Sequence, residues 1–234
     1  GEKAVRRARF KGDVCLIDGY GEDATYVRAV AASIRNAGFS EEAGDRLLFS
    51  FHSIPLKDIE AGDTYELQTG ATSLAVAGEL GLDRRAWTIS YQSRFDKGRT
   101  WLSPFTRPTL ERLAQAAEPG SRLFMVCPNF SVDCLETLYD IPAELEPVYR
   151  AALAGEYVDA DEEPGALENT GKATAHGPAP TARPTAAARP AVARGAHRQL
   201  GPDDDFVYVP CLNKTRAHLE VLLSVLSPYL GEAG

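Results

Sequence analysis

Short apolar runs alternate with longer amphipathic segments along most of this chain. The apolar runs are nearly uninterrupted, which is typical of parallel strands that helices cover on both faces. The runs lie at 13–18, 46–51, 86–91, 122–127 and 206–210, and helices are expected at 23–37, 66–81, 106–117, 131–153 and 214–230. Because each run precedes a segment of helical length, the sequence predicts an α/β fold with a doubly wound parallel sheet flanked by helices.

Two of the expected helices carry an apolar stripe with a spacing of three and four residues, which places side chains on one helical face. The first stripe consists of Val27, Val30, Ala31 and Ile34, and the second consists of Leu219, Leu222, Leu223 and Leu226. We expect both helices to pack against the sheet.

Residues 164–200 do not follow this pattern, because they are rich in Ala and Pro and nearly lack large apolar side chains. Such a segment cannot bury enough surface to fold. We therefore expect a disordered, dispensable insertion at 155–203 within one α/β domain formed by 1–154 and 204–234. Residues 164–200 carry five Lys or Arg and one Glu, a net charge of +4. A role as a basic tether to an acidic partner or an anionic lipid therefore stays open.

Composition and charge narrow the function classes. The 234 residues have a formal net charge of -8 and a pI near 5.1, which disfavours a general nucleic-acid binder. No apolar stretch approaches the roughly 18 to 20 residues that cross a bilayer, and the basic first residues lack the apolar core of a secretory signal. We expect a cytoplasmic protein without a transmembrane segment, for which peripheral membrane contact remains compatible with the sequence.

The cysteines Cys15, Cys127, Cys134 and Cys211 are too dispersed for a disulfide framework, and no pair has the short spacing typical of zinc sites. We interpret them as reduced thiols. Cluster ligation usually takes four thiolates, and only Cys127 and Cys134 lie close in sequence, so an iron-sulfur cluster is not expected.

Polar side chains follow the strand-like runs, at the edge where open parallel sheets bind ligands. His52 ends the second run, and the triplet Gln92, Ser93 and Arg94 ends the third. The fourth run leads into a helix with acidic residues at 136, 140 and 144. The histidine and the carboxylates are therefore expected to converge on one crevice.

Glu136, Asp140 and Glu144 are spaced by four residues, which on a regular helix confines them to an arc of about 80°. Pro142 lies between them and removes a backbone donor, so the helix must kink, bulge or restart there. Imidazole with carboxylate oxygens suits Fe(II) or Zn(II), and neutral imidazole is also a proton acceptor near neutral pH. The residues thus predict a metal-binding or acid-base crevice, without naming a substrate.

Each of these residues also has a purely structural interpretation. His52 alone can be a hydrogen-bonded histidine at a strand end, and the three carboxylates can form a solvated helix face. The irregular turn around Pro142 favours a site over a plain surface.

Five motifs in one order resemble the C-terminal half of ferrochelatase, a class II chelatase, and the resemblance covers residues 9–154 and 205–230. The motifs are SFHSIP (50–55), YQSRF (91–95), TWLSPFT (100–106), CPNFSVDCLETLYDI (127–141) and FVYVPCLN (206–213). Members of that family are lyases of heme biosynthesis that insert Fe(II) into a porphyrin with loss of two pyrrole protons. Two doubly wound halves enclose the porphyrin.

The resemblance implies roles for individual residues. His52 and Glu136 match the histidine and glutamate that flank the macrocycle, as metal ligands and proton-transfer groups. Asp140 and Glu144 match an acidic line that shuttles iron or protons to this pair. Trp101 matches a tryptophan near the macrocycle, although a plain core tryptophan is the alternative. The triplet 92–94 matches a motif that lines the pocket, although hydrogen bonding at the strand end explains each of its members equally well.

The resemblance also implies partners. The substrates would be ferrous iron and a porphyrin, either protoporphyrin IX or coproporphyrin III, with no tightly bound cofactor. A complete ferrochelatase has a further N-terminal α/β half, so we expect the pocket of this chain to be incomplete. Two alternatives remain: a half-size tetrapyrrole metal chelatase that homodimerises, and a non-catalytic tetrapyrrole- or metal-binding remnant.

Overall fold

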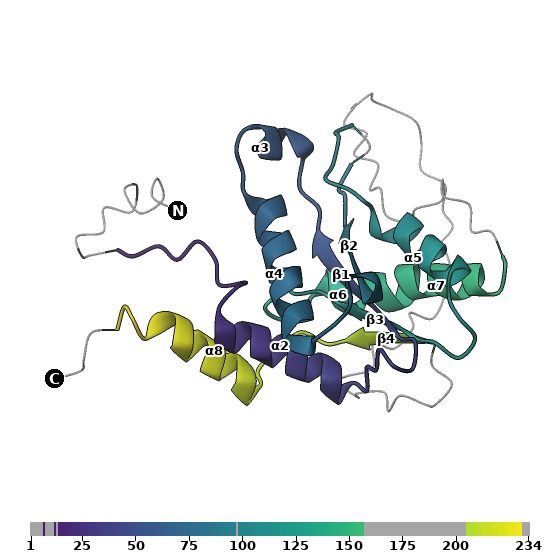
Figure 1. Cartoon of the computed structure of the whole chain (residues 1–234). Coiled ribbons are helices and arrows are strands. Elements are labelled where there is room, and N and C mark those ends of the chain that lie inside the picture. The colour runs from purple at the N-terminus through teal and green to yellow at the C-terminus, as the bar shows by residue number, and fades with distance from the viewer. Residues whose placement is uncertain (1–6, 8–11, 13, 97, 157–204, 231–234) are drawn as a thin grey trace, which may run out of the picture.

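The computed structural model describes residues 7, 12, 14–96, 98–156 and 205–230. In this part of the chain, four parallel strands form one sheet in the order β2-β1-β3-β4 (Figure 1). The strands are β1 (Arg46–His52), β2 (Trp87–Gln92), β3 (Leu123–Val126) and β4 (Phe206–Val209). The predicted α/β fold with a parallel sheet and flanking helices is confirmed.

Helices cover both faces of the sheet (Figure 1). Three helices share an apolar cluster with one face: α2 (Ala24–Asn36), α4 (Tyr65–Leu80) and α8 (Arg216–Leu226). The other face packs on α5 (Thr106–Gln115) and α7 (Glu146–Leu153). The short elements are α3 (Leu56–Glu60), α6 (Leu135–Leu138), a 3₁₀ turn (Arg84–Ala86) and a π-helical turn (Ile141–Leu145). No described helix is long and apolar enough to span a membrane.

Local signals in the sequence explain where these helices begin. The carboxylate of Asp23 accepts hydrogen bonds from the backbone N–H groups of Thr25 and Tyr26 and so caps α2. Thr215 caps α8 in the same way through His218. The α2 stripe, as predicted, is buried against the sheet.

The prediction of a strand at 13–18 is wrong for the described residues 14–18, which form no strand. The apolar side chains of Val14, Leu16 and Ile17 are 46%, 46% and 37% exposed. Their sequence suits a strand, but a strand forms only with a hydrogen-bonded neighbour. No described segment pairs with them.

α8 packs on the apolar cluster of the sheet, but through a face other than its leucine stripe. Leu219, Leu222, Leu223 and Leu226 are 38% to 55% exposed, whereas Val221 is fully buried. Val221 belongs to the cluster that includes α2, with Val225 partly buried beside it. The helix has two apolar faces, and the valine face is the one turned inward. Sequence spacing does not tell which of two such faces is buried.

The insertion expected at 155–203 lies outside the described residues except for residues 155 and 156.

Candidate metal and proton-transfer site

His52 is the last residue of β1 and is half-buried at the carboxyl edge of the sheet. Its Nδ1 atom lies 2.6 Å from the carbonyl oxygen of Ser53. Because a carbonyl oxygen only accepts hydrogen bonds, Nδ1 carries the proton in the neutral ring. Nε2 therefore keeps a lone pair, which can bind a metal ion or accept a proton.

A second set of contacts holds the backbone of His52. The Tyr65 hydroxyl donates to the His52 carbonyl oxygen at 2.6 Å and accepts a bond from Asn129 Nδ2 at 2.7 Å. Burial raises the pKa of Tyr65, so this hydroxyl keeps its proton at neutral pH. The start of α4 and the loop after β3 are thus both tied to the end of β1.

Glu136 and Asp140 lie close enough to His52 to interact with it electrostatically. The pKa of Glu136 is lowered, first by a hydrogen bond from the Cys134 thiol, then by its own backbone N–H and by the histidine. Burial and the charge of Glu136 raise the pKa of Asp140. Two neighbouring carboxylates with pKa values pushed apart can take different roles, one staying charged while the other accepts a proton.

The helix that carries the acidic residues breaks where Pro142 predicts it. α6 has four residues, and the π-helical turn Ile141–Leu145, which contains Pro142, separates it from α7. Glu144 lies on this wider turn and is half-buried. The regular stripe expected from the four-residue spacing is therefore interrupted between Asp140 and Glu144.

Two aromatic rings lie near His52, and sequence reasoning missed both. The Phe95 ring lies 5.1 Å from the imidazole and 5.9 Å from the Trp101 ring, and Phe130 lies 6.4 Å from the imidazole. Phe95 is 70% exposed, whereas Trp101 is 5% exposed and donates from Nε1 to the Asp96 carbonyl oxygen. The buried Trp101 ring therefore packs against the exposed Phe95 ring from the protein side. An aromatic residue directly after a strand-end triplet was the available signal.

The triplet 92–94 occupies three different environments. Gln92 is buried, and both ends of its amide are hydrogen-bonded within the protein. Ser93 has a positive φ of 61°, and its buried hydroxyl has no partner. This costly conformation at a strand end is a feature typical of functional sites. The Arg94 guanidinium lies 5.1 Å from the centre of the Phe105 ring.

Asp133, which sequence reasoning also missed, anchors the loop that leads to Glu136. Its carboxylate accepts bonds from the Tyr208 hydroxyl and from Asn213 Nδ2, both at 2.7 Å. In return, the side-chain oxygen of Asn213 accepts the backbone N–H of Asp133 at 2.8 Å. The loop after β3 is thereby fixed to the segment after β4.

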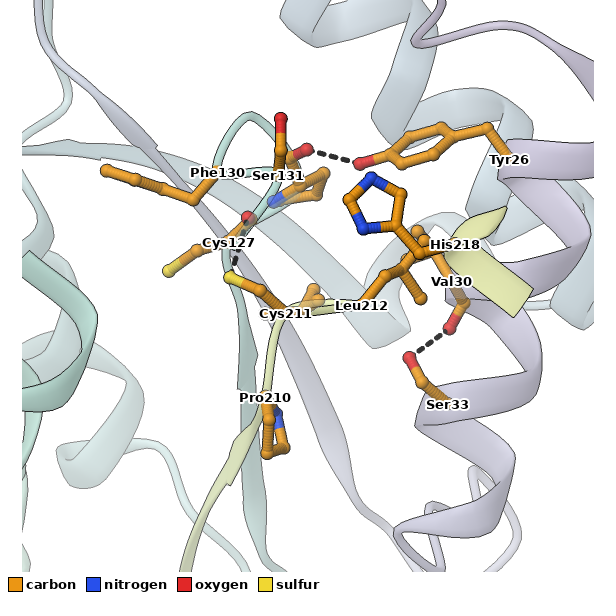
Figure 2. A pocket seen from close by; sticks show the side chains of 12 residues that line it. Tyr26, Val30, Ser33, Cys127, Phe130, Ser131, Pro210, Cys211, Leu212 and His218 are labelled. Atoms are coloured by element: carbon orange, nitrogen blue, oxygen red, sulfur yellow. Dashed lines mark hydrogen bonds between the residues drawn. The ribbon is translucent and has the colours of Figure 1, made fainter. Parts of the chain in front are cut away.

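A small cavity of about 10 Å³ lies beneath this loop, between the ends of β3 and β4 and the helices α2 and α8 (Figure 2). Cys127, Cys211, Tyr26 and His218 are among the residues that line it. His218 Nδ1 lies 2.5 Å from the Asn213 carbonyl oxygen, so this ring is held by the protein. Such a volume holds about one water molecule, which excludes this cavity as a porphyrin site.

Within the described residues, no three His, Cys, Asp or Glu side chains are arranged to hold a metal ion together. His52 and Glu136, which the sequence predicts as metal ligands, therefore belong to no such group of three. Two ligands bind a divalent ion weakly and leave most of its coordination positions to water or substrate.

Comparison with known proteins decides the family. Residues 2–161, more than half of the 234-residue chain, match the ferrochelatase family. The chain belongs to the ferrochelatase family. The matched range holds four of the five ferrochelatase-like motifs, and the fifth, at 206–213, lies beyond it.

Curated ferrochelatases from several bacteria resemble the chain. The ferrochelatase of Thioalkalivibrio sulfidiphilus (strain HL-EbGR7) is 38% identical over 155 residues, which are 66% of this chain and 41% of the relative. That of Xylella fastidiosa (strain 9a5c) is 44% identical over 128 residues, 54% of this chain and 38% of the relative. That of Stenotrophomonas maltophilia (strain R551-3) is 41% identical over 128 residues, which are 55% of this chain and 39% of the relative. The chain thus spans about two fifths of the length of these ferrochelatases.

Proposed function

We propose that this chain is the metal-handling wall of a ferrochelatase, which inserts Fe(II) into a porphyrin in heme biosynthesis. Family membership supports the reaction class. The observation that carries the proposal is the lone pair of His52 Nε2 beside the ionised Glu136, at the edge of an aromatic surface. Metal insertion needs a proton acceptor and a weak metal ligand at one place, and this arrangement offers both.

The residues divide the chemistry as follows. Two pyrrole N–H bonds break as the metal-nitrogen bonds form, and His52 accepts the two protons one after the other at Nε2. Glu136 remains negative and offsets the charge of the entering cation. Asp140, whose pKa is raised, receives each proton from His52, and Glu144 continues this route towards α7.

The aromatic residues and the strand-end triplet would hold the porphyrin. Phe95, supported by Trp101, offers an exposed ring face to a flat macrocycle. Ser93 and Arg94 follow the same strand and supply polar groups for the carboxylates of protoporphyrin IX or coproporphyrin III. Iron is a substrate here, and the proposed reaction uses no resident cofactor.

The second wall of the pocket would come from the part of a ferrochelatase that this chain does not span. The coverage of 38% to 41% of three relatives supports this division. A second copy of the chain, as in a half-size homodimeric chelatase, is the competing source. The cytoplasmic location inferred from the sequence remains a prediction.

Calorimetric titration with Zn²⁺ tests the metal site. We expect His52→Ala and Glu136→Ala each to lower the affinity at least about tenfold, a loss of about 1.4 kcal/mol. His218→Ala is the matched control, because His218 also bonds a backbone carbonyl through Nδ1 but lines the small cavity. Equal affinity in the wild type and in both site variants would reject the assignment of the site.

A further inference from the structure

Gln92 forms hydrogen bonds next to both members of the proposed metal-binding pair, His52 and Glu136. It is the last residue of β2 and lies opposite His52 in the strand register. Its backbone carbonyl oxygen accepts the N–H of Ser53 at 2.7 Å. The carbonyl of Ser53 is in turn the partner of His52 Nδ1. The backbone of Gln92 therefore holds the N–H of Ser53, the residue whose carbonyl group orients the imidazole.

The side chain of the same residue reaches the other member of the pair. Gln92 Nε2 donates to the backbone carbonyl oxygen of Glu136 at 3.1 Å. On the opposite side, its Oε1 accepts the Ser50 hydroxyl at 2.5 Å, with the Cys127 thiol at 3.8 Å. Since the Glu136 carbonyl can only accept, the amide group has one chemically sensible orientation.

A chain of buried hydroxyl groups fixes this orientation. Ser50 and Ser90 each lie 2.9 Å from the Thr106 hydroxyl, and all three side chains are at most 2% exposed. A hydroxyl has one proton, so the bond from Ser50 to Gln92 requires Thr106 to donate to Ser50 and Ser90 to donate to Thr106. The network runs in one direction and ends on Glu136. Such a satisfied buried network holds its members rigidly.

The helix that receives this bond is short. α6 spans only Leu135–Leu138 between a capping box formed by Cys134 and Thr137 and the π-helical turn, so the bond from Gln92 is a further support at Glu136 itself. Gln92 is only 5% exposed, so it contacts the segments that carry His52 and Glu136 from inside the protein.

We propose that Gln92 is the positioning residue that sets His52 and Glu136 at the spacing needed for a metal ion. This inference rests on the proposed function, and it assigns Gln92 a role different from contact with the porphyrin. Its backbone bond tolerates any side chain, so substitutions act through the side-chain bonds to Glu136 and Ser50. Outer residues that orient metal ligands typically account for 10- to 100-fold in metal affinity.

The test combines a double-mutant cycle with hydrogen exchange. We expect Gln92→Leu to weaken Zn²⁺ binding about tenfold and to have no further effect in a Glu136→Gln background. Gln92→Asn keeps an amide group, but its side chain is too short to reach both Ser50 and Glu136. It should weaken Zn²⁺ binding to the same extent, and it replaces the leucine variant if that variant does not fold. Ser73→Ala is the matched control, because it removes the hydrogen bond of a buried serine hydroxyl within α4, outside this network, and should change the affinity less than about twofold.

Amide exchange supplies a readout that needs no metal. In Gln92→Leu, the amides of Leu138 and Tyr139 should exchange about tenfold faster, a change of one power of ten in the local opening equilibrium, whereas the β1 amides should not change. Unchanged exchange in α6, or an equal loss of Zn²⁺ affinity with and without Glu136, would overturn the role of Gln92. A different result separates the two proposals. If Glu136→Gln leaves Zn²⁺ binding intact while amide exchange in α6 still rises in Gln92→Leu, the proposed metal site is wrong, but the support of α6 by Gln92 is confirmed.

Discussion

His52 Nδ1 lies 2.6 Å from the carbonyl oxygen of Ser53, so the nitrogen left with a lone pair is Nε2. Asn at position 52 keeps a donor where Nδ1 is but has no basic nitrogen. We expect His52→Asn to fold normally and to lower the rate of metal insertion by about 10² to 10⁴, the usual contribution of a general base. Initial rates of zinc-porphyrin formation check this in the chain complemented by the rest of a ferrochelatase. A wild-type rate in this variant would remove His52 from the mechanism.

Glu136 and Asp140 should not be equivalent. The lowered pKa of Glu136 keeps it charged, whereas the raised pKa of Asp140 suits proton transfer. We expect Glu136→Gln to weaken Zn²⁺ binding at least about tenfold and Asp140→Asn to change it less than about threefold, while both slow insertion. Zn²⁺ titration of each variant, and rate measurements on the same variant complemented by the rest of a ferrochelatase, separate the two effects. Equal losses of affinity would instead make Asp140 a direct ligand.

The fold was largely predictable from the sequence, because continuous apolar runs followed by amphipathic segments leave few alternatives to a covered parallel sheet. The errors have physical causes. Residues 14–18 have a strand-like sequence, but strand formation depends on a neighbour that a local pattern does not contain. In α8, Leu219 and Val221 mark two apolar faces, and the packing of the helix against α2 decides between them.

The candidate site was predictable in its charged members and less so in its supports. His52 and Glu136 stand out because strand ends and acidic helices are visible in sequence. Asp133 does not, and Gln92 stands out only as a residue at a strand end, because the partners that reveal their supporting roles lie 75 and 44 residues away in the chain. Phe95 is visible only as one more aromatic residue until its exposure and its contact with the imidazole are known.

The stability of the chain should depend on Asp133. Burial alone would raise the pKa of Asp133, but hydrogen bonds from Asn213, Tyr208 and Cys211 outweigh burial and lower it. We expect Asp133→Asn to lower the free energy of unfolding by about 1 to 2 kcal/mol at pH 7, a modest value because the carboxylate is partly exposed.

The effect of pH on this difference follows from the sign of the shift. A folded-state pKa below the unfolded value stabilises the fold fully above the unfolded pKa of about 4 and loses that effect as pH falls through the folded value. The difference between wild type and Asp133→Asn in urea unfolding should therefore be constant above about pH 5 and shrink below about pH 4. A difference that grows on acidification would contradict the role of the charged form.

The exposed ring of Phe95 should contribute to the affinity for porphyrin and not to the affinity for metal ions. We expect Phe95→Ala to weaken porphyrin binding about tenfold, because one stacking face is worth about 1 kcal/mol beyond its area, with Zn²⁺ affinity unchanged. Fluorescence quenching of the porphyrin measures the first and calorimetry the second. Tyr229→Ala is the control, since Tyr229 is also an exposed aromatic residue but follows α8. Equal porphyrin affinities in all three proteins would exclude Phe95 from the binding surface.

The isolated chain should insert metal slowly or not at all, and the missing part of a ferrochelatase should restore the reaction. In the proposed function, His52 and Glu136 lie on one wall of the pocket, whereas insertion requires a macrocycle held in place while its pyrrole protons are removed. Positioning of this kind can be worth roughly 7 to 11 kcal/mol, and a single surface cannot supply it. An anaerobic assay with Fe(II), or an aerobic one with Zn(II), follows metalloporphyrin absorbance for the chain alone and complemented, with sedimentation of the same samples. Full activity of the monomer would refute the one-wall interpretation, whereas activity that rises with the square of the chain concentration would identify a second copy as the other wall.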